Sequence, residues 1–548
     1  MSDRNREIIE LLSELVLLAT LEEGSSQSFR VRAYENAVHE LELVREDIAA
    51  MSEKELVALE GIGKSTAKKI REYVETGAIT KLEELRAAYP PSFVALSRIP
   101  GLGPKSLQKL RAELGIENLA DLRAAIEAEQ IRTLPGFGKK TEEKLAAAIA
   151  RIGDDGKVGK DRRTPIAEAM PVAEAVVARI RSLPQTRNAT CCGSLRRFRD
   201  TVADVDIVAV STDPVPIMEA FVTSPEVAQV LGHGDTKSST VTRAGLQLDL
   251  RVVEPAQEGA AILYFTGSKA HNIALRQRAL ERGWTLNEYG LTVLESGAIV
   301  AQETEQAIYE ALEMDWVPAP MREDTGEVML AARRALPAYL RGEDLRGDVI
   351  GAPDAVATAA RARGYGWSVV LGGLADQRDP TALIAREVRV ARDGSVPAPD
   401  GDPDADRAEA WIAVVEDHFD LPASEQTTRV CAALAHPRVS VLAAPTGRLI
   451  GTREPMELDF DRVIVAANEH RVALEIRADL ARLDPPAELL RRAHELEATF
   501  LLATRAQTAG ELDRAGYGVS LAQRAWVTRD RVLNTWDADR ALGWLRRA

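Results

Sequence analysis

The sequence predicts a multidomain protein with helical N-terminal domains, a mixed α+β unit in its middle and an α/β domain at its C-terminal end. Short segments up to about residue 150, such as 118–129, carry apolar residues three and four positions apart, which is typical of amphipathic helices. An amphipathic segment at 171–183 is followed by strand-like runs of alternating polarity, DVDIVAVS and LQLDLRVV. From about residue 340, strand-like runs such as WSVVLGG and VSVLAA alternate with helical ones, which predicts parallel strands.

Changes in these patterns place the expected domain boundaries. At 548 residues the chain exceeds the size of one ordinary domain, so several units are expected. The polar, proline-containing stretch at 317–326 indicates a linker. We expect a helical unit at 1–82, a second at 83–160, a mixed unit at 161–258, a further unit at 259–318, the linker at 319–340 and the α/β domain at 341–548.

The composition is that of a folded, soluble chain. The net charge of −15 argues against nucleic acid as a partner of the chain as a whole, but binding depends on local patches, so the charge excludes nothing. No apolar run approaches the length that spans a bilayer, and the first residues are polar, so we expect a cytoplasmic protein without a membrane partner. Cys191, Cys192 and Cys431 lack metal-ligand spacing and are expected in the core. We expect a monomer.

Three short segments share one pattern: LEGIGKSTAKKI (59–70), IPGLGPKSLQKL (99–110) and LPGFGKKTEEKL (134–145). Glycine permits the positive φ that the Gly-x-Gly turn needs, and the helix that follows offers its N-terminal N–H groups to a phosphate. One copy also occurs in plain helix connections, but three spaced copies favour helix-hairpin-helix binding of the DNA backbone. The candidate residues are Gly61, Gly63, Lys64, Gly101, Gly103, Lys105, Gly136, Gly138 and Lys139.

Two strand-like runs carry three carboxylates. Asp204 and Asp206 lie two positions apart, so on a strand both face the same way, and Asp249 alternates with leucines in LQLDLRVV. Asp-x-Asp alone is common, and a single carboxylate there is often part of a solvated face. Three converging carboxylates repel one another unless cations lie among them, and hard oxygen ligands suit Mg²⁺. The pattern therefore predicts a site for two divalent ions.

A resemblance to a known family rests on two further segments. Gly193-Ser194-Leu195-Arg196-Arg197 precedes Asp204, and a Gly-Ser turn followed by Asp-x-Asp resembles the nucleotidyltransferase signature. YFTGSKAHNIALRQRALERGWTLNEYGL (264–291) resembles the corresponding part of vertebrate DNA polymerase beta and its bacterial family X relatives. With the three hairpin segments the resemblance covers about residues 1–315. It implies a DNA polymerase built from a lyase-type helical domain, a helix-hairpin-helix domain, a nucleotidyltransferase palm and a domain that binds the nascent base pair.

The resemblance also implies a role for each matching residue. Asp204, Asp206 and Asp249 match the metal-binding aspartates, and Asp249 also takes the proton of the primer hydroxyl or positions the group that does. The remaining matches are contacts to the triphosphate (Ser194, Arg197 and, more weakly, Arg163), to the sugar 2′ position (Tyr264, Phe265, Gly267) and to the nascent pair and template (Asn272, Arg276). Core packing is the alternative for the two aromatic residues. Gln247 and Lys269 depart from the residues that the vertebrate enzyme carries.

Lys69 in the first hairpin segment resembles the Schiff-base lysine of the polymerase beta lyase domain. A neutral lysine can attack the aldehyde of an abasic sugar, and the like charges of Lys64 and Lys68 would favour that neutral form. Arg30 and Tyr34 are plausible matches to supporting residues of the family. The alternative is that these lysines only bind phosphate.

The segment 340–548 resembles the polymerase and histidinol phosphatase (PHP) domain, a distorted βα barrel, of many bacterial family X polymerases. The resemblance rests on DLRGD (344–348), APTGRLIGTREP (444–455), ALEI (473–476) and VLNTWDADRALGWL (532–545). Active versions hold about three metal ions with histidines and carboxylates. Those positions here are Ile350-Gly351-Ala352, Gly372-Gly373, Ala444 and Arg505-Ala506-Gln507, while Glu387 persists. Without its ligands the domain is expected to be a degenerate PHP domain that acts as a structural or interaction module and not as a nuclease.

These observations predict a DNA-directed DNA polymerase that fills short gaps in DNA repair. Its substrates would be gapped or nicked duplex DNA and dNTPs, its cofactor two Mg²⁺ ions that Mn²⁺ can replace, and its partners repair proteins that meet the C-terminal domain. The alternatives are a non-catalytic scaffold that binds DNA ends, and an abasic-site lyase.

Overall fold

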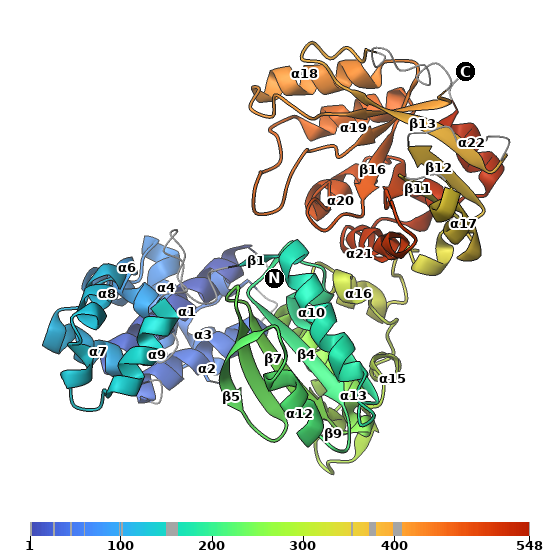
Figure 1. Cartoon of the computed structure of the whole chain (residues 1–548). Coiled ribbons are helices and arrows are strands. Elements are labelled where there is room, and N and C mark those ends of the chain that lie inside the picture. Colours follow the sequence, from blue (N-terminus) through green and yellow to red (C-terminus); the bar gives the residue numbers. More distant parts are fainter. Residues whose placement is uncertain are drawn as a thin grey trace. The chain divides into compact units, whose positions relative to one another are not determined.

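The structure, a computed structural model, describes residues 3–25, 28–43, 47–59, 61–97, 99, 102–149, 163–351, 354–371, 380–397 and 408–546. The chain divides into two compact units (Figure 1). One contains Met1–Arg163 and Ile273–Arg278, and the other contains Thr164–Asn272 and Ala279–Ala548. No helix among the described residues is long and apolar enough to cross a membrane.

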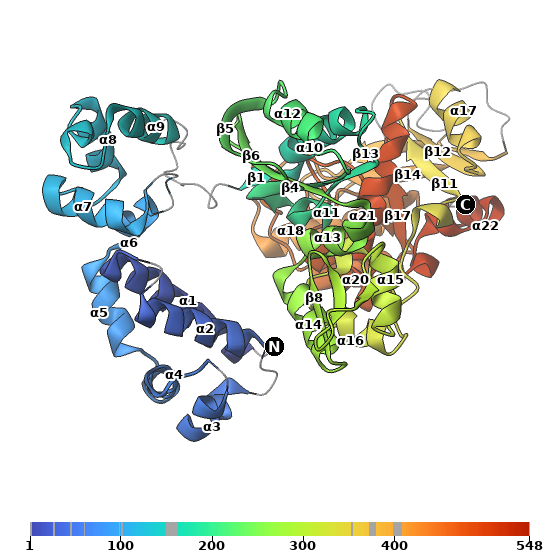
Figure 2. The ribbon, with the colours of Figure 1, turned by 90° about the horizontal axis from the view of Figure 1, so that it is seen from below.

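The N-terminal unit is built from helices, as the apolar spacing predicts, although α1 and α2, with 21 and 15 residues, are longer than the short helices expected. Its helices are α1 (Asp3–Glu23), α2 (Phe29–Leu43), α3 (Glu53–Ala58), α4 (Lys64–Thr76), α5 (Thr80–Ala88), α6 (Pro91–Leu96), α7 (Pro104–Leu114), α8 (Leu119–Glu127) and α9 (Lys139–Ile149). Helices α1 and α2 lie side by side (Figure 2). Leu12, Leu15 and Leu18 of α1 are buried, and their spacing of three places them on one face of the helix.

The hairpin segments form turns that lead directly into helices. Ser52 caps α3 with a complete capping box, and Gly77 ends α4 with a left-handed backbone. Between these helices Gly61 has φ +78°, a conformation that a residue with a Cβ rarely adopts. The order helix, glycine turn, helix is thus fixed by local sequence signals.

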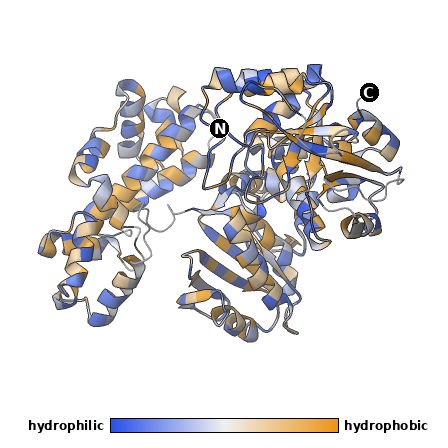
Figure 3. Ribbon diagram, turned by 45° about the horizontal axis from the view of Figure 1, so that its top comes forward, coloured by the Kyte–Doolittle hydropathy of each residue, from blue (hydrophilic) through white to orange (hydrophobic). Residues whose placement is uncertain are grey.

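The second unit begins with the palm, a five-stranded sheet in the order β2-β4-β7-β6-β5. Its strands and helices are β1 (Thr164–Pro165), α10 (Ile166–Arg181), β2 (Asn188–Cys191), α11 (Gly193–Arg196), β3 (Thr201–Val202), β4 (Asp204–Val210), α12 (Val215–Val222), β5 (Val227–His233), β6 (Lys237–Thr242) and β7 (Gln247–Val253). Strands β4 and β7 pair in parallel, whereas β2 and β6 run antiparallel to them. Residues on the strands alternate in hydropathy (Figure 3), because one face of the sheet packs on the helices.

The segment after the palm folds as a small helical and β unit. It contains α13 (Glu258–Thr266), α14 (Lys269–Leu280), β8 (Trp284–Asn287), β9 (Gly290–Val293), β10 (Ile299–Ala301), α15 (Glu305–Ala311), the 3-10 turn η5 (Ala319–Met321) and α16 (Glu327–Ala332). The stretch 319–340 was expected to be a linker. Its first part is instead folded, since η5 and α16 lie within it and Met321 and Arg322 are buried.

The C-terminal domain is a parallel, seven-stranded, nearly closed barrel. Its strands, β11 (Gly347–Ile350), β12 (Trp367–Leu371), β13 (Ala382–Arg389), β14 (Ala410–Val414), β15 (Val439–Ala443), β16 (Ala473–Arg477) and β17 (Phe500–Ala503), pair in sequence order. A parallel bridge between Ile350 and Ala506 joins the first and last strands. The helices α17 (Asp354–Ala362), α18 (Ala423–Leu434), α19 (Phe460–Glu469), α20 (Ala487–Glu495), α21 (Ala515–Arg524) and α22 (Ala538–Leu545) surround these strands, which are mainly hydrophobic (Figure 3). This architecture confirms the expected distorted βα barrel.

The palm and the C-terminal domain share one hydrophobic core. Buried residues of α10, including Val176 and Ile180, belong to the same cluster as Val519 and Leu521 of α21. The C-terminal domain is therefore packed against the palm rather than tethered by a flexible connection.

Candidate active site

Three carboxylates lie on neighbouring strands of the palm. Asp206 on β4 is the direct partner of Asp249 on β7, and Asp204 pairs with Gln247. Val205 and Leu248 between them are fully buried, whereas the three aspartates are half-buried. The strand period of two therefore sends the apolar side chains into the core and the carboxylates to one shared face.

Asp249 is held by its neighbours on the same sheet. Ser239 Oγ on β6 donates to Asp249 Oδ1, and Gln247 Nε2 donates to Asp249 Oδ2 at 2.8 Å. Gln247, which departs from the family pattern, thus orients the third aspartate. Both oxygens of the Asp249 carboxylate accept a hydrogen bond, which fixes the orientation of the side chain.

The carboxylates fit divalent ions that substrate oxygens help to hold. Among the described residues, no group of three or more His, Cys, Asp or Glu side chains is gathered tightly enough to hold a metal ion by itself. Mg²⁺ in phosphoryl-transfer sites is bound by one or two carboxylates, waters and substrate phosphates, so a complete protein cage is not required. Hard oxygen donors on one face of β4 and β7 match that arrangement.

The turn before these strands brings backbone close to a carboxylate. Gly193 begins α11 with φ +61°, and a Cβ added there would lie 2.5 Å from Asp206 Oδ2. Only glycine satisfies both the left-handed backbone and this close approach. Ser194 follows and is half-buried, so the predicted phosphate-binding turn lies directly beside the carboxylates.

Arg197 connects this turn to the end of α13. Its Nη1 donates to Thr266 O at 2.6 Å and its Nε to Glu323 Oε1 at 3.1 Å. A Cβ on Gly267 would lie 3.2 Å from Arg197 Nη1, so glycine leaves room for the guanidinium. Burial lowers the pKa of Arg197, although Glu323 opposes that shift. The structure thus brings Arg197 and Gly267, far apart in sequence, into contact.

Tyr264 and Phe265 lie at the end of α13, and Asn272 lies in the first turn of α14. The rings of Tyr264 and Phe265 meet edge to face with centroids 5.2 Å apart. Phe265 packs against a small buried cluster that includes Val253, and the Arg251 guanidinium lies 5.4 Å from its ring centroid. Asn272 Nδ2 donates to Tyr264 O at 2.8 Å. The Phe265 side chain is thus packed in part as a core residue. The hydrogen bond from Asn272 holds the backbone of Tyr264 in place.

Other predicted residues lie outside this cluster or at unit boundaries. Arg163 is exposed directly before β1, and Arg276 is half-buried one turn beyond Asn272 on α14. Lys69 on α4 donates to Ser65 Oγ at 2.9 Å and lies 5.6 Å from the Tyr34 ring centroid. Arg30 forms ion pairs with Glu22 and Glu23 on α1.

The three hairpin segments each present a helix N-terminus. Gly63 caps α4, Gly103 caps α7 and Gly138 directly precedes α9, and all three are exposed. Lys64, Lys105 and Lys139 in the first turns are exposed as well. Gly136 has φ +89°, like Gly61 in the first segment, and Gly101 lies outside the described residues.

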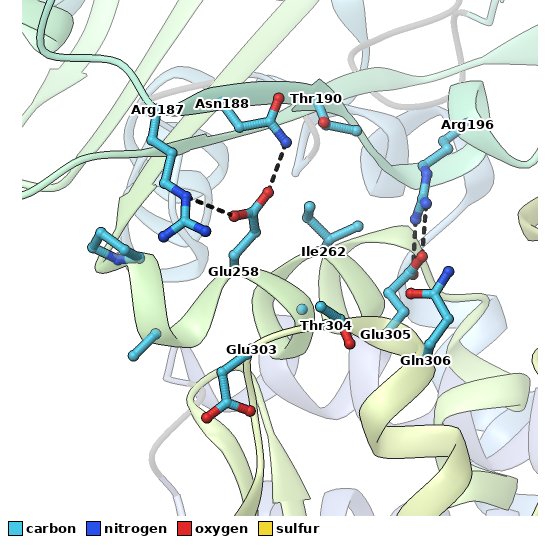
Figure 4. A pocket seen from close by; sticks show the side chains of 13 residues that line it. Arg187, Asn188, Thr190, Arg196, Glu258, Ile262, Glu303, Thr304, Glu305 and Gln306 are labelled. Carbon is cyan, nitrogen blue, oxygen red and sulfur yellow. Dashed lines mark hydrogen bonds and ion pairs between the residues drawn. The ribbon is translucent and has the colours of Figure 1, made fainter.

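A group of buried ion pairs beneath the turn was not anticipated from the sequence. Arg196 donates to both oxygens of Glu305, at 2.9 and 2.8 Å (Figure 4). Arg322 also donates to Glu305, at 2.6 Å. Burial opposes the charge on Glu305, but Arg322 and Arg196 outweigh it and lower its pKa. Arg322 and Glu323 both belong to the stretch whose polarity indicated a linker, and hydropathy patterns contain no signal for such a network.

A cavity of about 720 Å³ lies beside this network and apart from the three aspartates. It is lined by Arg187, which precedes β2, by residues of β2, and by the starts of α13 and α15. Figure 4 shows Glu258 between Arg187 and Asn188, and Asn188 Nδ2 donates to it at 2.7 Å. Charged side chains on the cavity wall are paired with opposite charges, so the wall has no excess of one charge that would select a charged ligand.

In the C-terminal domain an arginine pairs with the carboxylates that remain. Arg505 Nε donates to Glu475 at 2.6 Å, and its Nη1 pairs with Glu387. Although burial opposes the charge on Glu475, Arg505 and Arg477 hold its pKa at about 2. A guanidinium thus lies among carboxylates at a position where the resemblance expects a metal ligand. Ala352 and Gly372-Gly373, two further replaced ligand positions, lie outside the described residues.

Comparisons with known proteins place these features in a family. The family model of the DNA polymerase beta thumb matches residues 261–323, a helix-hairpin-helix domain matches 3–79 and a SAM-like helix-hairpin-helix tandem matches 93–151. The chain is 32% identical over 562 residues to "DNA polymerase/3'-5' exonuclease PolX" of Bacillus subtilis (strain 168), which covers 96% of this chain and 97% of that protein. It is 24% identical over 346 residues to DNA polymerase lambda of Rattus norvegicus, covering 56% of each chain. DNA polymerase lambda of Arabidopsis thaliana is 26% identical over 354 residues, covering 58% of this chain and 61% of that protein.

Proposed function

The chain belongs to the PolX family of family X DNA polymerases, and on this premise we propose that it fills short gaps in duplex DNA during repair. The observation that carries the proposal is the pairing of Asp206 with Asp249 beside Gly193 and Ser194. A protein that only bound DNA ends would not need three carboxylates on one face next to a phosphate-binding turn. The two lambda-type relatives and the three hairpin segments support a gapped or nicked duplex as the substrate.

The chemistry that we propose is attack of the primer 3′-hydroxyl on the α-phosphate of a dNTP with release of pyrophosphate. Two Mg²⁺ ions, or Mn²⁺ in their place, would be held by Asp204, Asp206 and Asp249 and would stabilise charge on the attacking and leaving oxygens. Asp249 accepts the proton of the primer hydroxyl or orients the group that does, and Ser239 and Gln247 hold its carboxylate in place.

The residues around the carboxylates hold the nucleotide. Ser194 and Arg197 bind the triphosphate, since the turn supplies N–H groups and Arg197 a planar fork of donors. Tyr264 and the Gly267 backbone border the sugar, where they exclude a 2′-hydroxyl by contact. Asn272 supports this element through the Tyr264 carbonyl.

We also propose that the C-terminal domain does not hydrolyse DNA. Arg505 pairs with Glu475 and Glu387, so the charge that a metal ion would supply is already present. The Bacillus subtilis relative is named as a 3′-5′ exonuclease as well as a polymerase. A 5′-labelled primer incubated with the protein and Mn²⁺ but without dNTP should keep its length, and shortening by a preparation free of contaminating nuclease would reject this proposal.

A lyase activity of Lys69 is a second candidate function. Its half-buried ammonium lies beside Ser65 and the Tyr34 ring on α4. Borohydride reduction should trap a covalent complex with a 5′-deoxyribose phosphate end, and Lys69→Ala should abolish it while Lys54→Ala does not. Equal trapping by both variants would show that a residue other than Lys69 forms the covalent complex.

Primer extension on a one-nucleotide gap tests the polymerase proposal. A 5′-labelled primer should lengthen by one nucleotide only with the dNTP that the template specifies and only with a divalent ion. Binding to the gapped duplex without any extension would instead favour the scaffold.

A further inference from the structure

The loop that follows the triphosphate-binding turn is held at three points by the C-terminal domain. This loop, residues 197–200, joins α11 to β3 and thereby to the first catalytic strand. Arg524, at the end of α21, donates from Nη1 to Arg197 O at 3.2 Å and to Glu323 Oε1 at 2.9 Å. The same Glu323 oxygen accepts from Arg197 Nε, so one carboxylate joins the two arginines.

The second contact is aromatic. Phe198 stacks on Tyr517 of α21 with ring centroids 5.9 Å apart and planes 27° apart. Phe198 has φ +59°, a left-handed backbone that is unfavourable for a residue with a side chain and persists only when its surroundings hold it. Phe198 is 3% exposed, so the C-terminal domain supplies part of the packing that holds this backbone.

The third contact is an ion pair that crosses between the domains. Arg448 Nη1 lies 2.7 Å from Asp200 Oδ2, and Arg448 Nε donates to Arg482 O at 2.7 Å. The Arg448 side chain is 6% exposed, so it is fixed by its own domain and presents a rigid donor to the loop. Asp200 O in turn accepts from Ile166 N, which begins α10.

We propose that the C-terminal domain clamps the loop 197–200 and that Arg524 and Arg448 are positioning residues for nucleotide binding by Arg197. A domain without a nuclease site thereby contributes to the polymerase reaction. The clamp rests on the proposed polymerase function. Arg524 acts through Glu323 and the Arg197 carbonyl, and touches no substrate itself.

Burial makes the clamp sensitive to the loss of one partner. The Arg524 side chain is 9% exposed and that of Glu323 is 20% exposed. Burial opposes the charge on Glu323, but Arg197 and Arg524 outweigh it and lower its pKa. Without Arg524, Glu323 would have Arg197 as its main remaining partner and would compete with the triphosphate for that guanidinium.

The test is steady-state extension on a one-nucleotide gap by the full-length protein and its Arg524→Ala variant. Because Arg197 contacts the triphosphate before and during the reaction, the KM for the templated dNTP should rise roughly three- to tenfold with kcat changed less than about twofold. The KM of Arg524→Lys, which keeps a positive charge beside Glu323, should lie between those of the wild type and Arg524→Ala. Glu323→Gln should raise the KM to a similar extent. The KM of the double variant Glu323→Gln/Arg524→Ala should be no higher than that of either single variant, because both residues act in one network.

Two controls separate positioning from general loss of stability. Arg492→Ala removes an exposed ion pair to Asp461 in the same domain, and Arg429→Ala removes a buried pair to Asp417. Neither arginine contacts the loop, so the KM of both variants, measured at a temperature where they are folded, should equal that of the wild type. A raised KM in Arg429→Ala equal to that in Arg524→Ala would overturn the clamp.

Hydrogen exchange tests the clamp without catalysis. Backbone amides in peptides covering 194–203 should exchange faster in Arg524→Ala and in Arg448→Ala than in the wild type. Unchanged exchange and an unchanged KM would overturn the clamp while leaving the polymerase intact. Faster exchange in a protein whose wild type extends no primer would support the clamp and reject the proposed function.

Discussion

Asp206 and Asp249 face each other across the parallel strand pair that β4 and β7 form in the palm. Their neighbours Ile207 and Leu250 also pair, and both are buried. A shift of one residue in register would bury the carboxylates and expose these side chains. The hydrophobic core of the palm thus fixes the register, and the register places the two carboxylates side by side.

Gly193→Ala should impair extension although it adds a single methyl group. The new Cβ would lie 2.5 Å from Asp206 Oδ2 and would strain a backbone with φ +61°. Because displacing a catalytic group by about 1 Å can cost on the order of a hundredfold, we expect a loss of at least about tenfold in kcat on gapped DNA. Gly232→Ala on β5 is the control, since nothing lies within 4 Å of its added Cβ. Equal activity of both variants would show that Asp206 does not need this space.

Binding to gapped duplex should weaken steeply with salt through the hairpin segments. Lys64, Lys105 and Lys139 lie exposed at helix N-termini, where each can neutralise one phosphate. Each change to alanine should reduce the slope of log K against log salt by about 1, because one counterion fewer is released. Fluorescence anisotropy at several salt concentrations measures this, with the exposed Lys54→Ala as control. If all three variants had the slope of the wild type, these three lysines would not bind DNA phosphates.

Arg505→Ala should destabilise the C-terminal domain. The change leaves Glu475 buried with Arg477 as its remaining cation, and breaking such a pair from one side costs about 3–5 kcal/mol. Urea unfolding monitored by tryptophan fluorescence should show a lower midpoint. Arg492→Ala, which removes an exposed pair, should change the free energy of unfolding by less than about 1 kcal/mol. Equal stability of both variants would mean that the guanidinium does not supply the charge that Glu475 needs.

Asp348 should make the stability of the protein fall between about pH 4 and pH 7. Burial raises its pKa to about 7, although Thr504 and the Val349 amide donate hydrogen bonds to its carboxylate. The folded state therefore keeps a proton that the unfolded state releases, so this contribution is full below about pH 4 and is lost as the pH rises through 7.

Asp348→Asn removes this titration and should flatten the pH dependence. The difference of about 3 pKa units corresponds to roughly 4 kcal/mol, so the variant should gain stability relative to the wild type by up to that amount between pH 4 and pH 8. Urea midpoints at both pH values, with the exposed Asp420→Asn as control, measure the gain. If Asp348→Asn kept the pH dependence of stability seen in the wild type, a group other than Asp348 would cause it.

Local patterns predicted the fold because each element carries its own signal. The apolar spacing within 118–129, the Gly-x-Gly turns and the alternation around Asp249 each act within one segment. The barrel followed from its alternating runs together with the family resemblance. The predicted convergence of Asp204, Asp206 and Asp249 then needed only the pairing of β4 with β7.

The contacts that no local pattern predicted join distant segments. Glu305 pairs with Arg196 and Arg322, and Glu323 joins Arg197 to Arg524, across separations of 17 to 201 residues. A buried ion pair leaves no periodicity, because its members look like ordinary surface residues in the sequence. For this reason the polar composition of 317–326 indicated a linker, although two of its charges lie inside the protein.

The most direct test of the central claim is extension of a one-nucleotide gap by Asp249→Asn. This variant keeps the size of the side chain and removes the charge that would bind cations and accept the proton. We predict that extension falls by at least about a thousandfold with Mg²⁺ or Mn²⁺ while the affinity for gapped DNA changes less than about threefold. Asp235→Asn, in the exposed turn between β5 and β6, should extend like the wild type. Extension by Asp249→Asn at the wild-type rate would contradict the assignment of the palm carboxylates as the catalytic site.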